Sequence, residues 1–124
     1  MLTAGCKLDV SGLSTGQDVE SRAKARWAAL IKRDFQAAYA YTTPGFREVT
    51  PERVYATSFG NGVVWKSIEL DKTECESERC KIHLTLNYSI QSVAGLPHPV
   101  DLKDVLVETW IKREGEWWFV PPLR

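Results

Sequence analysis

The sequence predicts a single α+β domain, in which a long amphipathic helix lies on a strongly curved antiparallel sheet. Three observations carry this prediction: an apolar stripe at helical spacing in the first third of the chain, strand-like segments joined by turns in the second half, and a length of 124 residues. A chain of this length can enclose one hydrophobic core. We therefore expect a folded domain at residues 17–124 and a flexible tether at residues 1–16.

The first element is a helix predicted from about Asp18 to Tyr41. Its apolar residues fall on one stripe and its basic and polar side chains on the other sides, so one face of the helix should be buried. Glycines, serines and a threonine at residues 7–16 are typical of a flexible segment. The stripe comprises Val19, Ala23, Trp27, Leu30, Ile31, Phe35, Ala38 and Tyr39.

Two Thr-Pro pairs follow this helix, Thr43-Pro44 and Thr50-Pro51. A threonine can accept hydrogen bonds from the first free N–H groups of a helix, and the proline after it presets the helical φ. Each pair can therefore begin a short helix. We expect the second of these helices to end near Gly60, before the chain turns into the sheet.

The sheet is predicted to begin at Val63. Three further strands, joined by hairpins, are expected at residues 81–91, 102–113 and 116–120. Opposed residues of antiparallel strands share a face of the sheet, so the register decides which side chains are buried. We pair Ile82 with Ile111.

This pairing makes a core face that continues across the last turn to Trp118 and Val120. The outer face then carries Trp110, Trp117 and Phe119. An exposed aromatic cluster of this kind is typical of a contact with another subunit. We therefore expect a homodimer that forms through the sheet.

Two of the three cysteines, Cys75 and Cys80, flank the turn between the first two strands. Paired strands would bring them to a spacing that suits a disulfide bond, which persists mainly in oxidising compartments. The alternative is a metal site of Cys75, Cys80 and His83, but this spacing fits no familiar zinc motif and a fourth ligand is absent nearby. We expect the disulfide, and neither a metal nor another cofactor.

The disulfide register conflicts with the side-chain alternation of the first strand. It places Glu69 and Asp71 on the core face and leaves Ile68 and Leu70 outside. A β-bulge between Leu70 and Cys75 would restore the usual alternation, and we favour it. Otherwise both carboxylates point into the enclosed side.

The segment Leu2-Thr3-Ala4-Gly5-Cys6 resembles the lipobox of bacterial lipoproteins. The resemblance implies export, acylation of Cys6, and a location in the bacterial cell envelope, on the periplasmic side. A basic and apolar segment should come before such a box, so we expect the start to lie within a longer signal sequence. The alternative is a chance match with an ordinary free thiol.

The charge balance argues against nucleic acid as a partner. Sixteen Lys and Arg residues match sixteen Asp and Glu residues, so no strong field exists to gather phosphates or to draw the domain to an anionic surface. No apolar run reaches the length of a spanning helix. Membrane attachment is expected only through a lipid anchor.

Four local features resemble the nuclear transport factor 2-like superfamily of cone-shaped α+β domains: an aromatic in the helix, Trp27; the Ala-Tyr-x-Tyr helix end, Ala38 to Tyr41; the Pro-x-Phe-Arg step, Pro44 to Arg47; and the last strand, Gly115 to Phe119. The resemblance spans roughly Asp18 to the C-terminus. The family includes ketosteroid isomerases, polyketide cyclases, dehydratases and many exported proteins, so the fold alone fixes no function.

In enzymes of this family, the cone holds a small apolar ligand beside a carboxylate or histidine base. The weak catalytic candidates here are Glu69, Asp71 and Tyr39, none of which aligns with the family's catalytic residues. By parity, His83 lies on the outer face. A ligand pocket would be lined by Trp27, Tyr39, Trp65 and Trp118, although these side chains could simply fill the core.

We therefore expect an exported lipoprotein domain that binds a small apolar ligand or a protein partner without catalysis. The alternative is a lyase or isomerase that acts on a small hydrophobic substrate in the cone, with Glu69 or Asp71 as the base. A buried carboxylate beside an open cavity would favour the enzyme.

Overall fold

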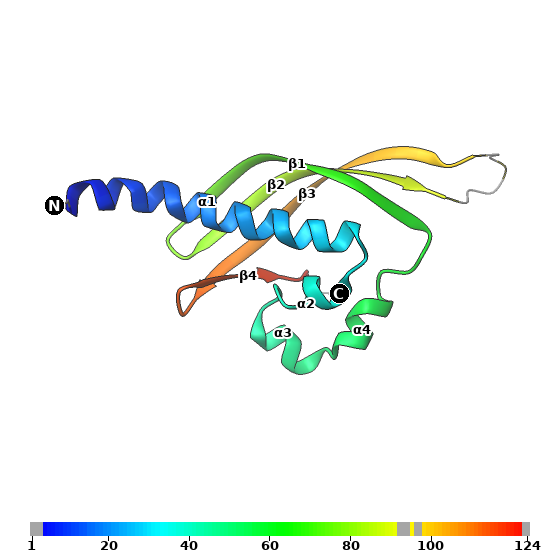
Figure 1. Cartoon of the computed structure of the whole chain (residues 1–124), viewed down its shortest axis with the longest axis horizontal. Helices are drawn as coiled ribbons and strands as arrows, with labels where there is room; N and C mark the ends of the chain where they lie inside the picture. Colours follow the sequence, from blue (N-terminus) through cyan, green and yellow to red (C-terminus); the bar gives the residue numbers. More distant parts are fainter. Residues whose placement is uncertain (1–3, 92–94, 96–97, 123–124) are drawn as a thin grey trace.

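The computed structural model describes residues 4–91, 95 and 98–122 and shows an α+β domain (Figure 1). Its elements are α1 (Ala4–Ile31), α2 (Phe35–Tyr39), α3 (Pro44–Val49), α4 (Glu52–Thr57), β1 (Val63–Glu76), β2 (Arg79–Ile90), β3 (Val100–Arg113) and β4 (Glu116–Val120). The predicted fold class is thus confirmed.

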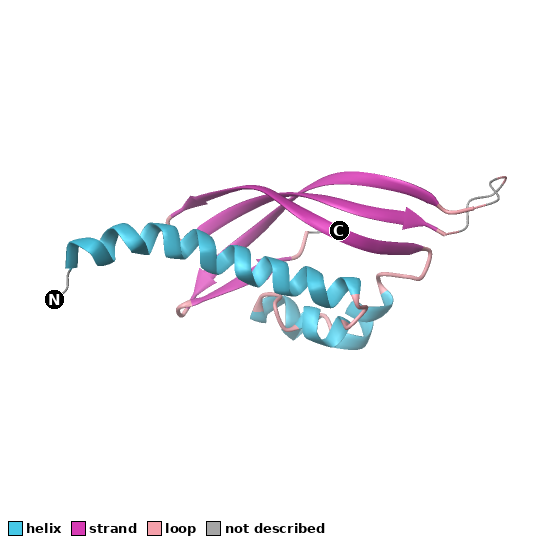
Figure 2. Cartoon of the chain, turned by 45° about the horizontal axis from the view of Figure 1, so that its top comes forward, coloured by secondary structure: helices cyan, strands magenta, loops and turns pink. Residues whose placement is uncertain are grey.

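The four strands form one antiparallel sheet in the order β1-β2-β3-β4. The sheet is curled, and α1 runs along one of its faces, while α2, α3 and α4 lie on the same side (Figure 2). We call the face toward α1 the inner face and the opposite one the outer face. None of the helices in the described part of the chain is long and apolar enough to span a membrane.

The long helix differs from its prediction at both ends. It begins at Ala4, so residues 7–16 have a helical backbone where their glycines predicted an irregular tether, and its first turns extend past the sheet (Figure 1). It ends at Ile31, because Arg33 adopts a left-handed φ of 60° and the Asp34 side chain caps a new helix by accepting from the N–H of Ala37. The apolar stripe therefore continues into α2 after a break.

The two short helices begin where the Thr-Pro pairs predicted. Thr43 caps α3 through its side chain, which accepts from the N–H of Phe46, and Pro44 occupies the first helical position. For α4, in contrast, Pro51 is the N-cap, and no side chain accepts a capping hydrogen bond. The predicted capping role of Thr50 is wrong, since this residue ends α3.

The bulge that we favoured in β1 is present. The pairing with β2 shifts between Leu70 and Lys72, which leaves Asp71 as an extra residue, and a second shift occurs between Trp65 and Ser67. The shift turns Ile68 and Leu70 toward the core and leaves Glu69 and Asp71 exposed. The bulge thus restores the alternation that the disulfide register disturbed.

The predicted register between β2 and β3 is wrong by three residues. Ile82 lies opposite Glu108 and not opposite Ile111. Because side chains alternate with period two, an odd shift exchanges the two faces of β3 and, through the correctly predicted β3–β4 hairpin, those of β4. The residues assigned to the core face, including Ile111, Trp118 and Val120, therefore lie on the outer face.

The predicted aromatic interface is consequently wrong. Trp110, Trp117 and Phe119 are exposed by only 0%, 2% and 6% and belong to the core. Burying these three rings removes more apolar surface from water than burying the smaller side chains of the other face would. The rest of the core comes from α1, α2, α4 and β2, through Val19, Ala23, Trp27, Ala29, Leu30, Ala38, Tyr55, Cys80, Ile82, Leu84 and Leu86.

Candidate functional site

A buried polar network lies between α1 and the inner face of the sheet. Its centre is the carboxylate of Glu108 on β3, which is 7% exposed. Oε2 of Glu108 accepts from Nη1 of Arg26 at 2.9 Å and from Nε1 of Trp27 at 2.8 Å, while Oε1 accepts from Nε1 of Trp110 at 3.2 Å. One charge pair and two indoles thus meet inside the domain.

Local structure explains why these four side chains converge. Arg26 and Trp27 are neighbours on the face of α1 that looks toward the sheet, and Glu108 and Trp110 are two residues apart on β3, so they share the inner face. The Arg26 guanidinium also lies 3.6 Å from the centre of the Phe119 ring, on β4. An aromatic face that contacts the guanidinium favours its positive charge.

Three buried polar atoms around this network have no hydrogen-bond partner among the described residues: Nε of Arg26, the hydroxyl of Tyr55 and Nε1 of Trp117. Burial raises the pKa of the Tyr55 hydroxyl, and the nearby positive charge of Arg26 offsets part of this increase. Unpaired buried polar groups are costly unless water or a ligand meets them.

The network is better suited to holding charge than to moving protons. A carboxylate that already accepts three hydrogen bonds from fixed donors has few free lone pairs with which to remove a proton. Arg26 keeps its charge at any ordinary pH. The arrangement can therefore position α1 on the sheet and place the charged Arg26–Glu108 pair among aromatic side chains.

Three of the four predicted pocket residues do gather in this interior. Trp27 and Trp65 meet edge to face with ring centres 5.8 Å apart, and Phe59 lies between Trp65 and Tyr55 at 5.4 and 5.0 Å. The ring of Tyr39 is 5.3 Å from that of Tyr55. The rings therefore fill the space beside the network with mutual contacts.

The fourth predicted pocket residue, Trp118, lies elsewhere. Because of the register shift, its side chain is on the outer face, opposite Ile111 of the neighbouring strand. Its ring contacts Arg22 of α1 and Arg47 of α3. The prediction that Trp118 lines a pocket with Trp27 is thus wrong.

The weak catalytic candidates do not converge on the interior. Glu69 and Asp71 are exposed, and Oδ2 of Asp71 accepts from the hydroxyl of Thr85 at 2.8 Å. The Tyr39 hydroxyl is within hydrogen-bond distance of two backbone oxygens, at 2.6 Å from that of Thr50 and 3.1 Å from that of Arg47. Tyr39 therefore ties α2 to α3 and has little freedom to act on a substrate.

The cysteine prediction is confirmed, since Cys75 and Cys80 form a disulfide bond with their Cα atoms 4.0 Å apart. The metal alternative is excluded by this bond, and no group of His, Cys, Asp and Glu suited to a metal ion occurs among the described residues. His83 lies on the outer face as predicted, with Nε2 at 2.9 Å from Oε1 of Glu74.

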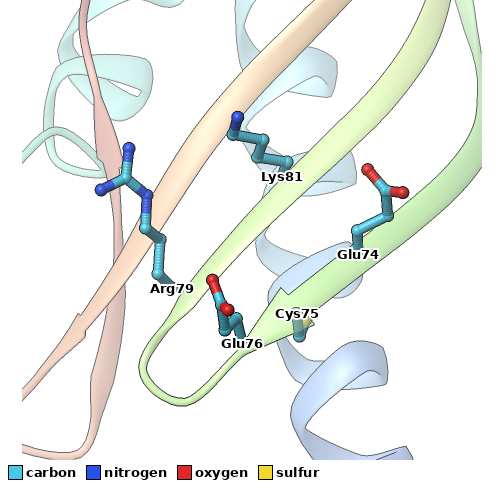
Figure 3. Close-up of a pocket in the computed structure, with 5 residues that line it drawn as sticks. All are labelled: Glu74, Cys75, Glu76, Arg79 and Lys81. Atoms are coloured by element: carbon cyan, nitrogen blue, oxygen red, sulfur yellow. The ribbon is translucent and has the colours of Figure 1, made fainter.

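A cavity of about 350 Å³ lies at the disulfide end of the β1–β2 hairpin. It is lined by two acidic residues and Cys75 from β1 and by two basic residues from β2: Glu74, Cys75, Glu76, Arg79 and Lys81 (Figure 3). The hydrogen bond from His83 lowers the pKa of Glu74, as does the charge of Lys72. This is a charge-balanced, open surface and differs from the enclosed apolar pocket that a small hydrophobic ligand requires.

The outer face of the sheet carries exposed apolar side chains. Val105 and Val107 on β3 are 73% and 54% exposed. They lie opposite Thr85 and His83 of β2, and Ile111, Trp118 and Val120 continue the same face as half-buried side chains. We call these five apolar residues, Val105, Val107, Ile111, Trp118 and Val120, the outer apolar strip.

Sequence reasoning missed Arg26, Tyr55 and Glu108. Arg26 was placed among the polar sides of the helix, and Glu108 was assigned to the outer face by the shifted register. One signal could have found Arg26 and Glu108: a charged residue that alternates with a tryptophan, Glu108 with Trp110, and an arginine next to Trp27 of the apolar stripe. A buried carboxylate needs such donors.

No model of a known protein family matches the sequence. Nor does any curated protein sequence match it significantly. Solved structures do match. One is a protein of the nuclear transport factor 2-like family from Streptomyces avermitilis, for which dehydratase activity has been suggested. It superposes with a TM-score of 0.62 at 12% identity, over 87% of this chain and 97% of that one.

A SEC-C motif-containing protein from Rhodopseudomonas palustris superposes with a TM-score of 0.59 at 17% identity, over 77% of this chain and 70% of that one. The curled sheet, the long helix on its inner face and the likeness to the Streptomyces protein show that this chain has the nuclear transport factor 2-like fold. At these identities the likeness concerns the fold and leaves the chemistry to the residues.

Proposed function

We propose that this chain is a non-catalytic binding domain that associates with a second copy of itself through the outer apolar strip. The observation that carries the proposal is the exposure of Val105 and Val107 on the outer face of β3, in the part of the strand that does not pair with β4. Large apolar side chains exposed side by side on a soluble domain commonly mark a contact surface. A face that pairs with its own copy forms a closed two-fold dimer.

The interior supports a binding role over a catalytic one. The lyase or isomerase alternative needs a free base in the cone, but its two proposed bases, Glu69 and Asp71, are exposed. The interior carboxylate, Glu108, already accepts hydrogen bonds from three donors. When the interior polar groups already form hydrogen bonds with one another, recognition of a partner is better served by the surface of the domain.

Sedimentation velocity of the parent and of Val105→Glu and Val107→Glu tests the proposal. We expect a dimeric parent at micromolar concentration and monomeric variants, because a carboxylate buried in an apolar contact loses its hydration. Val49→Glu is the matched control, since Val49 is 79% exposed on α3, away from the sheet. A monomeric parent, or variants that stay dimeric, would contradict the proposal.

A small apolar ligand is the second candidate. One observation favours it: the hydroxyl of Tyr55 and Nε of Arg26 are buried without a hydrogen-bond partner among the described residues. A ligand with one polar atom could meet them when the surrounding rings move apart. Titration with a hydroxylated aromatic probe such as naphthol, followed through the indole N–H signals of Trp27 and Trp110, tests it. Saturable shifts that Tyr55→Phe weakens are expected, and unchanged spectra would overturn it.

We also propose that the domain is exported and acylated on Cys6, on the periplasmic side of the bacterial envelope. Two features support this: the lipobox-like segment that ends at Cys6, and the Cys75–Cys80 disulfide, a bond typical of oxidising compartments. Expression of the natural gene should give a membrane-bound protein whose N-terminal peptide carries acyl groups. Cys6→Ser should release it, and an unmodified Cys6 peptide from the parent would refute acylation.

A further inference from the structure

Two arginines contact one tryptophan of β4, a strand whose outer edge is hydrogen-bonded to residues 41–43. The guanidinium carbon of Arg22, from α1, is 5.3 Å from the ring centre of Trp118, and that of Arg47, from α3, is 5.1 Å from it. Arg22 also lies 4.8 Å from the ring of Tyr41. We call Arg22, Arg47 and Trp118 the arginine–tryptophan cluster.

Each guanidinium is held in place by a backbone carbonyl. Nε of Arg22 donates to the carbonyl oxygen of Trp117 at 2.7 Å, and Nε of Arg47 donates to that of Thr42 at 3.1 Å. Both hydrogen bonds use only Nε, so the terminal nitrogens can bind an anion, although Nη1 of Arg22 lies 3.6 Å from Oε1 of Glu116. A fixed guanidinium loses less conformational entropy when it binds an anion than a freely moving one.

The cluster carries more positive than negative charge. Among the described residues, one carboxylate lies within ion-pair distance of these arginines. It belongs to Glu116, whose Oε1 is 3.6 Å from Nη1 of Arg22. That carboxylate is half exposed and beyond hydrogen-bond distance, and Arg47 has no acidic partner among the described residues. Two cations that contact the same indole ring, with one anion beyond hydrogen-bond distance, attract a further anion.

We propose that the arginine–tryptophan cluster binds a phosphoryl group. Terminal N–H groups of arginine form paired hydrogen bonds with phosphate oxygens. A carboxylate offers two oxygens, enough for one such fork, whereas a phosphoryl group offers three and can accept from two arginines that approach from different elements. The two arginines come from α1 and α3 and belong to neither the outer apolar strip nor the interior network, while Trp118 is shared with the strip.

Binding of inorganic phosphate and of a soluble phosphomonoester, phenyl phosphate, tests the proposal in chloride buffer. The indole N–H signal of Trp118, assigned by its loss in Trp118→Phe, should shift and saturate with each phosphate. Arg47→Ala should weaken this binding about tenfold, as expected for one lost charge-assisted fork. Arg53→Ala, which removes an exposed arginine of α4, is the matched control and should change nothing.

Arg47→Lys separates recognition from folding. It keeps the charge, so a folded protein with affinity reduced about threefold is expected, because lysine cannot form the fork. Absence of a saturable shift in the parent, or equal loss in Arg53→Ala, would overturn the site. Acetate that binds as tightly as phosphate would overturn the preference for a phosphoryl group.

Vesicles separate the two sources of such a group. Binding to vesicles that contain phosphatidic acid, lost in Arg47→Ala and absent with phosphatidylcholine alone, would assign the site to a lipid headgroup. Saturable binding of phenyl phosphate without vesicle binding would assign it to a free phosphomonoester. Failure of both would overturn the proposal, whatever the oligomeric state of the parent.

Discussion

Both faces of the sheet carry apolar side chains, but among the described residues only the inner face holds a buried polar network. On the inner face Glu108 accepts three hydrogen bonds from side chains that are themselves buried. On the outer face, polar contacts such as the Lys72–Glu74 pair at 3.6 Å are exposed to solvent. The inner face thus combines the larger aromatic side chains with fixed polar partners, whereas the outer face leaves its polar groups to solvent.

The largest expected effect comes from removing the centre of the inner network. Glu108→Ala should lower the free energy of unfolding by about 3 to 5 kcal/mol, because it leaves the Arg26 guanidinium buried without its partner. Urea unfolding followed by far-UV circular dichroism measures it. Glu69→Ala, on the outer face, is the control and should change stability by less than about 0.5 kcal/mol.

Glu108→Gln refines this test, since the amide keeps an acceptor for the two indoles and loses the charge. An intermediate loss is expected. If Glu108→Ala and Glu69→Ala destabilise equally, the inner face does not depend on its network and the contrast between the faces is lost.

A second comparison uses tryptophans that neighbour each other across the β3–β4 hairpin but lie on opposite faces. Trp110→Phe should cost about 2 to 3 kcal/mol, because it removes both buried volume and a hydrogen bond to Glu108. Trp118→Phe keeps an aromatic ring beside the arginines and should cost less than about 1 kcal/mol. Chemical denaturation of both variants checks the face assignment, and the reverse order would support the other register.

The sequence allowed the fold class and the strands to be predicted, because alternation, turns and caps are local signals. The bulge at Asp71 could also be predicted, since the disulfide supplied a second, independent constraint on the register of β1. No such constraint existed between β2 and β3. Because β3 has apolar residues on both faces, the alternation of its side chains is compatible with either face in the core, and so with two registers against β2.

The candidate site was missed for the same reason. In the correct register Glu108 meets the donors on α1, and any odd slip would send it to the outer face and leave Arg26 unpaired inside. The buried pair thus favours the same register as burial of the three large rings does. Such selection is non-local, since it joins residues 82 positions apart, and local pattern cannot reveal it.

The contribution of the Cys75–Cys80 disulfide to stability can be compared with that of the buried contacts on the inner face. Replacing both Cys75 and Cys80 by alanine should lower the free energy of unfolding by about 2 kcal/mol, since the closed loop is short. Thermal unfolding of the parent with and without reductant should reproduce this loss. Reduction that leaves the stability of the parent unchanged would contradict a structural role for the bond.

The smallest expected effect concerns Tyr55 and depends on pH. Burial raises the pKa of its hydroxyl above the value in the unfolded chain, so the folded state holds this proton more tightly. The resulting stability is fully present below the ordinary tyrosine pKa of about 10 and is lost as the pH rises through the higher folded value. The parent should therefore lose stability above about pH 10 through this group.

Tyr55→Phe removes both the titration and an unpartnered buried hydroxyl. At pH 7 we expect it to be neutral or to stabilise by up to about 1 kcal/mol. Unfolding curves of the parent and the variant between pH 8 and 11 should diverge in favour of the variant as the pH rises. Parallel curves would mean that the Tyr55 hydroxyl finds a partner or reaches solvent. The polar network on the inner face would then be accessible to water, and the contrast with the solvent-exposed outer face would be smaller.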